Sequence, residues 1–135
     1  MFTTQSPEPQ FAIAGLFLEK LAAEDFAQLA LALEADAKLS ALLPRGLREW
    51  EGREAVCDAF TTLFGGMDEY AVLDATVGLI GTRLQLSWRL HVRGGRLGPH
   101  DFVVEQQGYA DAGPTGRLQS LSLVCSGFCK EHFDA

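Results

Sequence analysis

The spacing of apolar residues changes along the chain, and this change constrains the fold more than any other feature of the sequence. Up to about Met67, apolar residues recur every three or four positions, which is the spacing of an amphipathic helix. Beyond Met67 they alternate with polar residues, as in a strand with one buried face. Helices gathered in the first half and strands in the second predict an α+β fold.

The first half of the chain predicts helices and one short strand. Two helices are expected within residues 10–36, divided near Ala23, with a single bent helix as the alternative. A short strand is expected over residues 37–44. The clearest helix covers residues 53–66 and ends at Gly65-Gly66.

The second half predicts long strands separated by turns rich in glycine and proline. The strands are expected over residues 70–81, 82–93, 100–111 and 117–128. The second of them alternates most regularly: one face carries Leu84, Leu86, Trp88, Leu90 and Val92, and the other carries Arg83, Gln85, Ser87, Arg89 and His91. An antiparallel sheet with helices on one face would enclose a core and leave its outer face to solvent or a partner.

Length and composition predict one cytoplasmic domain. The 135 residues divide into a flexible N-terminus (1–9), a domain (10–128) and a C-terminal tail (129–135). The net charge of −7 and the lack of a basic face argue against a nucleic-acid partner. No signal peptide and no apolar stretch of membrane-spanning length is visible, so no membrane partner is expected. An odd number of cysteines, 3, indicates reduced thiols.

The order and spacing of these elements resemble the SnoaL-like group of the nuclear transport factor 2-like superfamily, which also contains ketosteroid isomerase. The resemblance runs from Phe11 to Phe128. It is carried by "LAAEDFAQLALALEADAKL", similar to the opening of that fold, by the Gly-led helix in "EWEGREAVCDAF", and by "GRLQSLSLVCSGF", similar to the last strand. It implies a cone-shaped curved antiparallel sheet wrapped by three helices around an apolar pocket, with no cofactor, and a homodimer through the outer sheet face.

Ketosteroid isomerase uses an Asp base and a protonated Asp as a hydrogen-bond donor. By the resemblance, the base would lie near the end of the first strand, where this chain has Ser40 to Pro44 and no carboxylate. The donor would lie on the third long strand, where Gln107 stands at or near that position. The steroid-isomerase mechanism is therefore not expected here.

The pocket face of the third long strand is predicted from the parity of the last strand. The residues of the last strand expected to face inward, and to bind a ligand, are Leu121, Leu123 and Cys125. The neighbouring strand would then present Glu105, Gln107 and Tyr109 to the pocket. One bulge would exchange this set for Phe102, Val104 and Gln106.

An inward Glu105 among apolar side chains would suit a general acid or base, with Tyr109 as a second catalytic residue and Gln107 orienting a ligand oxygen. The alternative is that Glu105 pairs with Arg89 on the outer face. Trp50 and Trp88 could stack on a ligand or simply pack in the core.

Charged residues near the expected pocket mouth have a simpler interpretation. Arg45, Arg48 and Glu49 follow the first strand, close to where the resemblance places the mouth, and are expected to be surface charges. His91 and His100 flank a Gly-rich turn and are expected to be exposed or structural.

No metal site is expected at the end of the chain. Cys125, Cys129 and His132 have a suggestive spacing, but on an extended chain positions four apart lie about 13 Å from each other. Only a tight turn at Gly127 would bring these side chains close enough to share a zinc ion. Cys129 and His132 are instead expected in a tail beyond the fold.

Two functions remain open at this point. The first is a cofactor-free isomerase, cyclase or dehydratase that acts by proton transfer on an apolar, oxygenated small molecule. The second is a non-catalytic module with the same fold that binds a small-molecule ligand or a protein partner.

Overall fold

A computed structural model describes residues 8–131 of the chain, so the N-terminus expected to be flexible and the position of His132 lie largely or wholly outside the described residues. The helices are α1 (Glu8–Ala22), the 3-10 helices η1 (Phe26–Ala32) and η2 (Gly95–Leu97), and α2 (Arg53–Phe64). The strands are β1 (Leu33–Leu43), β2 (Gly46–Glu51), β3 (Glu69–Ile80), β4 (Arg83–Arg93), β5 (Asp101–Ala112), β6 (Leu118–Cys125) and β7 (Cys129–Lys130).

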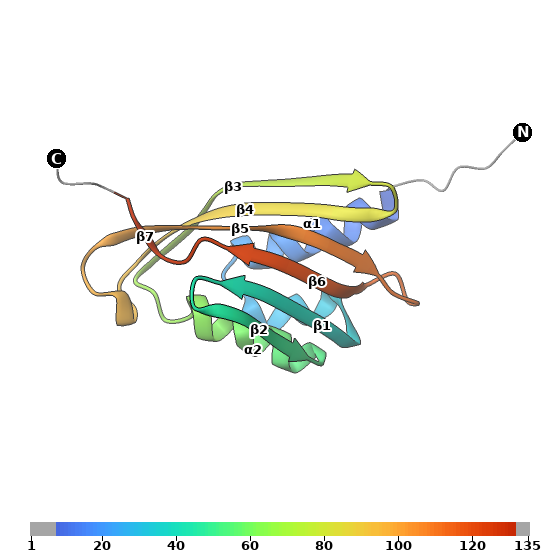
Figure 1. Ribbon diagram of the computed structural model, residues 1–135, viewed down its shortest axis with the longest axis horizontal. Coiled ribbons are helices and arrows are strands. Elements are labelled where there is room, and N and C mark those ends of the chain that lie inside the picture. Colours follow the sequence, from blue (N-terminus) through green and yellow to red (C-terminus); the bar gives the residue numbers. More distant parts are fainter. Residues whose placement is uncertain (1–7, 132–135) are drawn as a thin grey trace, which may run out of the picture.

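The strands form one curved, open sheet with the order β2-β1-β6-β5-β4-β3, and β7 pairs with β5 (Figure 1). The run from β3 to β6 is antiparallel, as expected. The sheet is nevertheless mixed, because β1 pairs with β6 in parallel. The prediction of a wholly antiparallel sheet was wrong on this point, since alternation of side chains indicates which face is buried but not the direction of the neighbouring strand.

The helices cover one face of the sheet, and the core lies between the two layers (Figure 1). Helix α1 packs against β3 and β4, whereas α2 packs against β1, β2 and η1. The regular alternation predicted for β4 is confirmed by burial: Leu84, Leu86, Trp88, Leu90 and Val92 are buried at the helical side. Burial of this apolar set is the main force that orients the sheet.

The division of the N-terminal helical segment near Ala23 is confirmed. Helix α1 ends at Ala22, and Glu24 has a positive φ of 60°, the left-handed conformation common just after a helix. The amide of Asp25 donates to the carbonyl oxygen of Lys20 at 3.0 Å, which closes the last turn.

The second predicted helix is shorter than expected, because β1 begins at Leu33 rather than near residue 37. The local sequence is rich in Ala and Leu, which favour a helix, and tertiary contacts override this preference. The buried carboxylate of Glu34 accepts hydrogen bonds from the amide (3.0 Å) and the hydroxyl (2.6 Å) of Thr115 in the β5–β6 turn. These bonds hold the first residues of β1 against the turn between β5 and β6.

Two further segments are strands where none was expected. Residues 46–51, where no strand was predicted, form β2, paired with β1 from Lys38↔Glu51 to Leu43↔Gly46. Cys129 and Lys130 were placed in a tail beyond the fold, yet they pair with Val103 and Phe102 of β5. Within residues 8–131, no helix has the length and apolar character needed to cross a membrane.

Candidate functional site

The pocket face of β5 is the reverse of the predicted one. Gln106 pairs directly with buried Trp88 on one side and buried Cys125 on the other, so its side chain points into the core. Residues opposite each other in an antiparallel pair share a face. The prediction counted residues back from β6 through the turn into β5. A register shift between Asp111 and Ala112 adds one residue to this count, which exchanges the inward and outward faces of β5. The competing set, with Val104 and Gln106 buried, is the correct one.

The residues predicted as catalytic therefore lie on the outer face of the sheet. Glu105 pairs with Arg89 (3.1 Å between Oε2 and Nη2), with side chains 43% and 47% exposed. The ring of Tyr109 lies under the guanidinium of Arg83, 5.2 Å from the ring centroid. Gln107 is exposed on the same face. The prediction that these side chains face a pocket inside the fold was wrong, and the alternative Glu105–Arg89 pair is present.

Trp88 packs in the core and offers no surface for a ligand. It is 1% exposed, and its indole Nε1 donates a 2.8 Å hydrogen bond to Gln106 Oε1. Phe17 and Phe60 complete an aromatic cluster around it, with ring centroids 5.7–6.4 Å apart. Side chains thus fill this part of the space between helices and sheet.

Trp50 is half-buried on β2, beside a shallow groove against α2. The guanidinium of Arg48 stands 5.8 Å from its ring centroid. The groove holds about 380 Å³ and is bordered by both polar and apolar side chains. A role of Trp50 in binding a ligand stays a prediction.

The inward orientation of Leu121, Leu123 and Cys125 is confirmed by their burial. Cys125 is the last residue of β6 and reaches a cavity of about 670 Å³ at this end of the sheet. We call this cavity the rim pocket. Its lining consists of Leu43, Pro44, Arg45, Gly46, Leu47, Arg48, Leu63, Arg96, Cys125, Gly127 and Phe128.

The rim pocket combines apolar walls with three guanidinium groups. Arg96 is fixed by hydrogen bonds to the carbonyl oxygens of Thr62 (2.7 Å) and Leu63 (3.2 Å), and it stands 5.4 Å from the ring centroid of Phe128. Arg45 and Arg48 come from the β1–β2 hairpin. None of the described lining residues is an acid, so positive charge gathers here in a chain whose net charge is −7.

A close backbone approach shapes one side of the rim pocket. Gly127 has a φ of +76°, and a Cβ added there would lie 2.6 Å from Cγ of Pro44. Only glycine suits this conformation and this contact. The turn after β6 can therefore lie directly against the β1–β2 hairpin.

A second cavity, of about 650 Å³, lies between η1 and α2. Its charged lining residues are mixed, with Arg53 and Arg117 opposed by Glu54 and Asp58, so it has no strong preference for an ion of either sign. Cys57 lies in its wall, where burial raises the pKa of the thiol. A protonated thiol is a poor nucleophile, and this cavity is the weaker candidate.

Sequence reasoning found part of the rim pocket. Arg45 and Arg48 were noted near the expected mouth but interpreted as surface charge. Arg96 and Phe128 were missed, because they come from the Gly-rich turn after β4 and from the segment after β6, far apart in the sequence. The available signal was Arg96 within "RGGRLGP". A turn rich in glycine does not itself require a long charged side chain at this position.

Comparisons with known proteins place the fold. No family model matches the sequence, and no curated protein resembles it closely enough to match. A provisionally assigned SnoaL-like polyketide cyclase from Shewanella denitrificans OS-217 superposes with a TM-score of 0.67 at 15% identity, covering 90% of this chain and 92% of that one.

Two further solved structures have the same architecture. A provisionally assigned ketosteroid isomerase from Kribbella flavida gives a TM-score of 0.63 at 13% identity, covering 95% of this chain and 82% of that one. An LEH-like epoxide hydrolase from M. tuberculosis gives 0.64 at 17% identity, covering 88% and 84%. The predicted nuclear transport factor 2-like fold is confirmed. At these identities the likeness concerns the fold, which hosts several chemistries.

Proposed function

We propose that this protein binds an apolar small molecule carrying an anionic oxygen group, such as a carboxylate, in the rim pocket. One observation carries the proposal: three arginines line a cavity of about 670 Å³ that also has apolar walls, and its described lining holds no acid. That volume falls within the usual range of small-molecule sites. Guanidinium groups pair with carboxylates through directional, charge-assisted hydrogen bonds, and the apolar walls would bury the rest of the ligand.

We favour binding over catalysis. A cofactor-free isomerase, cyclase or dehydratase needs a group in the pocket that takes up and returns a proton. Among the described residues, the rim pocket offers guanidinium groups and the Cys125 thiol. Glu105, the carboxylate first considered as acid or base, lies on the opposite face and is paired with Arg89. The site thus supports recognition better than proton transfer.

We further propose a cytoplasmic homodimer that associates through the outer sheet face. Support for the interface comes from one cross-strand row in which Leu47, Leu42 and Val124 are paired neighbours, 59%, 49% and 51% exposed. Adjacent exposed apolar side chains of this size favour contact with another surface. Reduced thiols at Cys57, Cys125 and Cys129 agree with a cytoplasmic location.

The binding proposal is tested first by native mass spectrometry of the freshly purified chain, which looks for a co-purified small acid. The second step is a fluorescence titration with two probes of similar size, anilinonaphthalene sulfonate (anionic) and N-phenylnaphthylamine (uncharged). The wild type is expected to bind the anionic probe more tightly. The double variant R45Q/R48Q should weaken binding of the anionic probe by roughly tenfold and leave the uncharged probe nearly unaffected.

A matched control separates the pocket from general surface charge. Arg83→Gln removes a cation on the outer face, where Arg83 pairs with Asp111 at 3.0 Å. This variant should bind both probes like the wild type. Equal weakening by R83Q, or no change in R45Q/R48Q, would reject the rim pocket as the anion site.

A further inference from the structure

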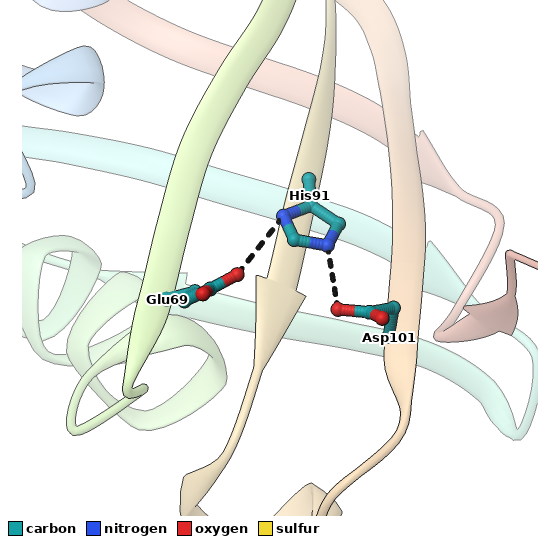
Figure 2. Close-up of side chains that lie close together, drawn as sticks. All are labelled: Glu69, His91 and Asp101. Carbon is teal, nitrogen blue, oxygen red and sulfur yellow. Dashed lines mark hydrogen bonds and ion pairs between the residues drawn. The ribbon is translucent and has the colours of Figure 1, made fainter.

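A histidine lies between carboxylates on the outer face of the sheet, apart from the rim pocket. Figure 2 shows His91 of β4 with one ring nitrogen directed at Glu69 of β3 and the other at Asp101 of β5. The distances are 4.0 Å from Nδ1 to Glu69 Oε2 and 2.9 Å from Nε2 to Asp101 Oδ1. Ligand atoms of these three residues all lie within 4.8 Å of one another.

A third carboxylate approaches from the end of the described chain. Glu131 Oε2 lies 3.5 Å from His91 Nε2. Its amide donates to the carbonyl oxygen of Asp101 at 3.1 Å, so the pairing of β7 with β5 holds it beside the histidine. The cluster therefore draws on strands β3, β4 and β5 and on the residue that follows β7.

The neighbouring row of the same face shows what is unusual here. In that row, Arg89 of β4 lies between two carboxylates, 3.8 Å from Asp74 and 3.1 Å from Glu105. A permanent cation therefore balances the acids of β3 and β5. In the cluster around His91, the corresponding central group is an imidazole, which carries no permanent charge.

The acids of the cluster are only partly balanced by other groups. Arg93 donates to Glu69 and compensates one of the three carboxylates. The carboxylates of Asp101 and Glu131 then face an imidazole, which carries no permanent charge, and their side chains are 34% and 37% exposed. A divalent cation beside Nε2 would neutralise both of them.

We infer that His91, Asp101 and Glu131 form a binding site for a divalent transition-metal ion of the zinc type. The Nε2 atom and one oxygen each of Asp101 and Glu131 would be the ligands, so the two carboxylates would have to close around the ion when it binds. Two ligands of a tetrahedral zinc ion with bonds of about 2.0–2.2 Å lie roughly 3.3–3.6 Å apart, and the 3.5 Å from Nε2 to Glu131 fits this separation. A modest rotation of Asp101 opens the 2.9 Å contact to the same spacing.

Glu69 completes the arrangement from the other side of the ring. Histidine ligands commonly donate their second N–H to a carboxylate, which fixes the tautomer and the ring orientation. Glu69 Oε2 lies 4.0 Å from Nδ1, beyond hydrogen-bond length, and a rotation of its side chain would bring it into this role. The nitrogen ligand selects zinc, cobalt or nickel over magnesium and calcium, which prefer oxygen ligands.

The test is a calorimetric titration of the full, metal-free chain with Zn²⁺, with Mg²⁺ and Ca²⁺ as comparison ions. The wild type should bind one Zn²⁺ per chain and neither of the other ions comparably. H91Q and D101N should each weaken Zn²⁺ binding by roughly tenfold or more, and E69Q by up to tenfold. Ring-nitrogen NMR signals of His91 should shift on Zn²⁺ addition, which a purely structural role would not produce.

Two variants serve as matched controls. E105Q removes the same charge from the same strand as D101N, but at the row of Arg89, so it reports what the loss of one negative charge on this face does by itself. H100Q removes an exposed histidine outside the cluster. Both should bind Zn²⁺ within twofold of the wild type, and circular dichroism should show that all variants fold.

The proposal is overturned by any of three results. The first would be that the wild type fails to bind one Zn²⁺ per chain. The second would be that H91Q binds Zn²⁺ as tightly as the wild type, and the third that E105Q weakens binding as much as D101N. The second result would place the ion elsewhere in the chain, and the third would reduce the effect to overall charge.

Discussion

The indole Nε1 of Trp88 and the side-chain carbonyl of Gln106 form a 2.8 Å hydrogen bond between two residues that are each 1% exposed. This bond explains why a polar residue occupies the inner face of β5. An unpaired indole N–H in an apolar interior is costly, and Gln106 is the cross-strand partner directly opposite Trp88.

Replacing Gln106 by leucine should lower the free energy of unfolding by about 1–3 kcal/mol, because the buried N–H loses its acceptor. Urea denaturation at neutral pH measures this change. Gln107→Leu, one position away on the outer face, should change stability by less than about 0.5 kcal/mol. The double variant W88F/Q106L should recover part of the loss, and strict additivity of the two single changes would contradict the role assigned to this bond.

Gly108→Ala should destabilise the sheet by at least about 2 kcal/mol, since there is no room for a side chain at this position. A Cβ at Gly108 would clash with the carbonyl oxygen of Ser122 on β6. The control is Gly78→Ala on β3, where the nearest atom would be Gln85 Oε1 at 3.8 Å. Thermal unfolding that affects both variants equally would show that the β5–β6 contact is looser than described.

Alkaline pH should destabilise the protein through Tyr70. Its hydroxyl donates to the carbonyl oxygen of Leu21 at 2.7 Å, and burial, aided by the charge of Glu24, raises its pKa above the usual value. The unfolded state loses this proton from about pH 10, whereas the folded state retains it. The contribution of Tyr70 is therefore complete below about pH 10 and falls above it, by at most about 1.4 kcal/mol per pH unit.

Comparison of variants isolates this effect. Y70F lacks the hydrogen bond to Leu21, so its free energy of unfolding at neutral pH should be lower than that of the wild type by about 0.5–1.5 kcal/mol. Above pH 10 its stability should decline less steeply than that of the wild type. Y109F, altered on the outer face, should keep the wild-type decline. Denaturant unfolding at intervals from pH 8 to pH 11 provides the curves, and a parallel decline in Y70F and wild type would be evidence against Tyr70 as the source.

The three cysteines should differ in reactivity. Cys129 is exposed, whereas Cys57 and Cys125 are 7% and 8% exposed. Burial also raises the pKa of the Cys57 thiol, which lowers its thiolate fraction near neutral pH. Iodoacetamide followed by peptide mass spectrometry should label Cys129 first and Cys57 only after unfolding, and early labelling of Cys57 would indicate local opening between η1 and α2.

The sequence predicted those parts of the fold in which polar and apolar residues alternate clearly. In β4 each apolar residue is followed by a polar one, and its two faces were assigned correctly. In β5 the adjacent pair Val103-Val104 and the polar run from Glu105 to Gln107 fit either parity. The choice between them depends on pairing with Trp88 and Cys125, which is a property of the assembled sheet.

The rim pocket and the histidine cluster were beyond prediction for a related reason. Arg96 and Phe128 are 32 residues apart in the sequence. They meet because η2 and the turn after β6 lie at the same end of the sheet. His91 and Glu131 meet because the short strand β7 pairs with β5. A strand of two residues is too short to show an alternating pattern in the sequence. Sites of this kind are defined by tertiary contacts, and no local pattern encodes them.

The parallel pairing of β1 with β6 has a consequence for the order of events during synthesis. Among residues 8–131, β6 is the strand that links the β1–β2 hairpin to β3–β5 within the sheet, and it follows all of these strands in the sequence. Before β6 is in place, no described pairing joins β1–β2 to β3–β5, and each group has an open edge at the position that β6 will occupy. Completion of the fold thus depends on one strand, which joins the two halves of the sheet.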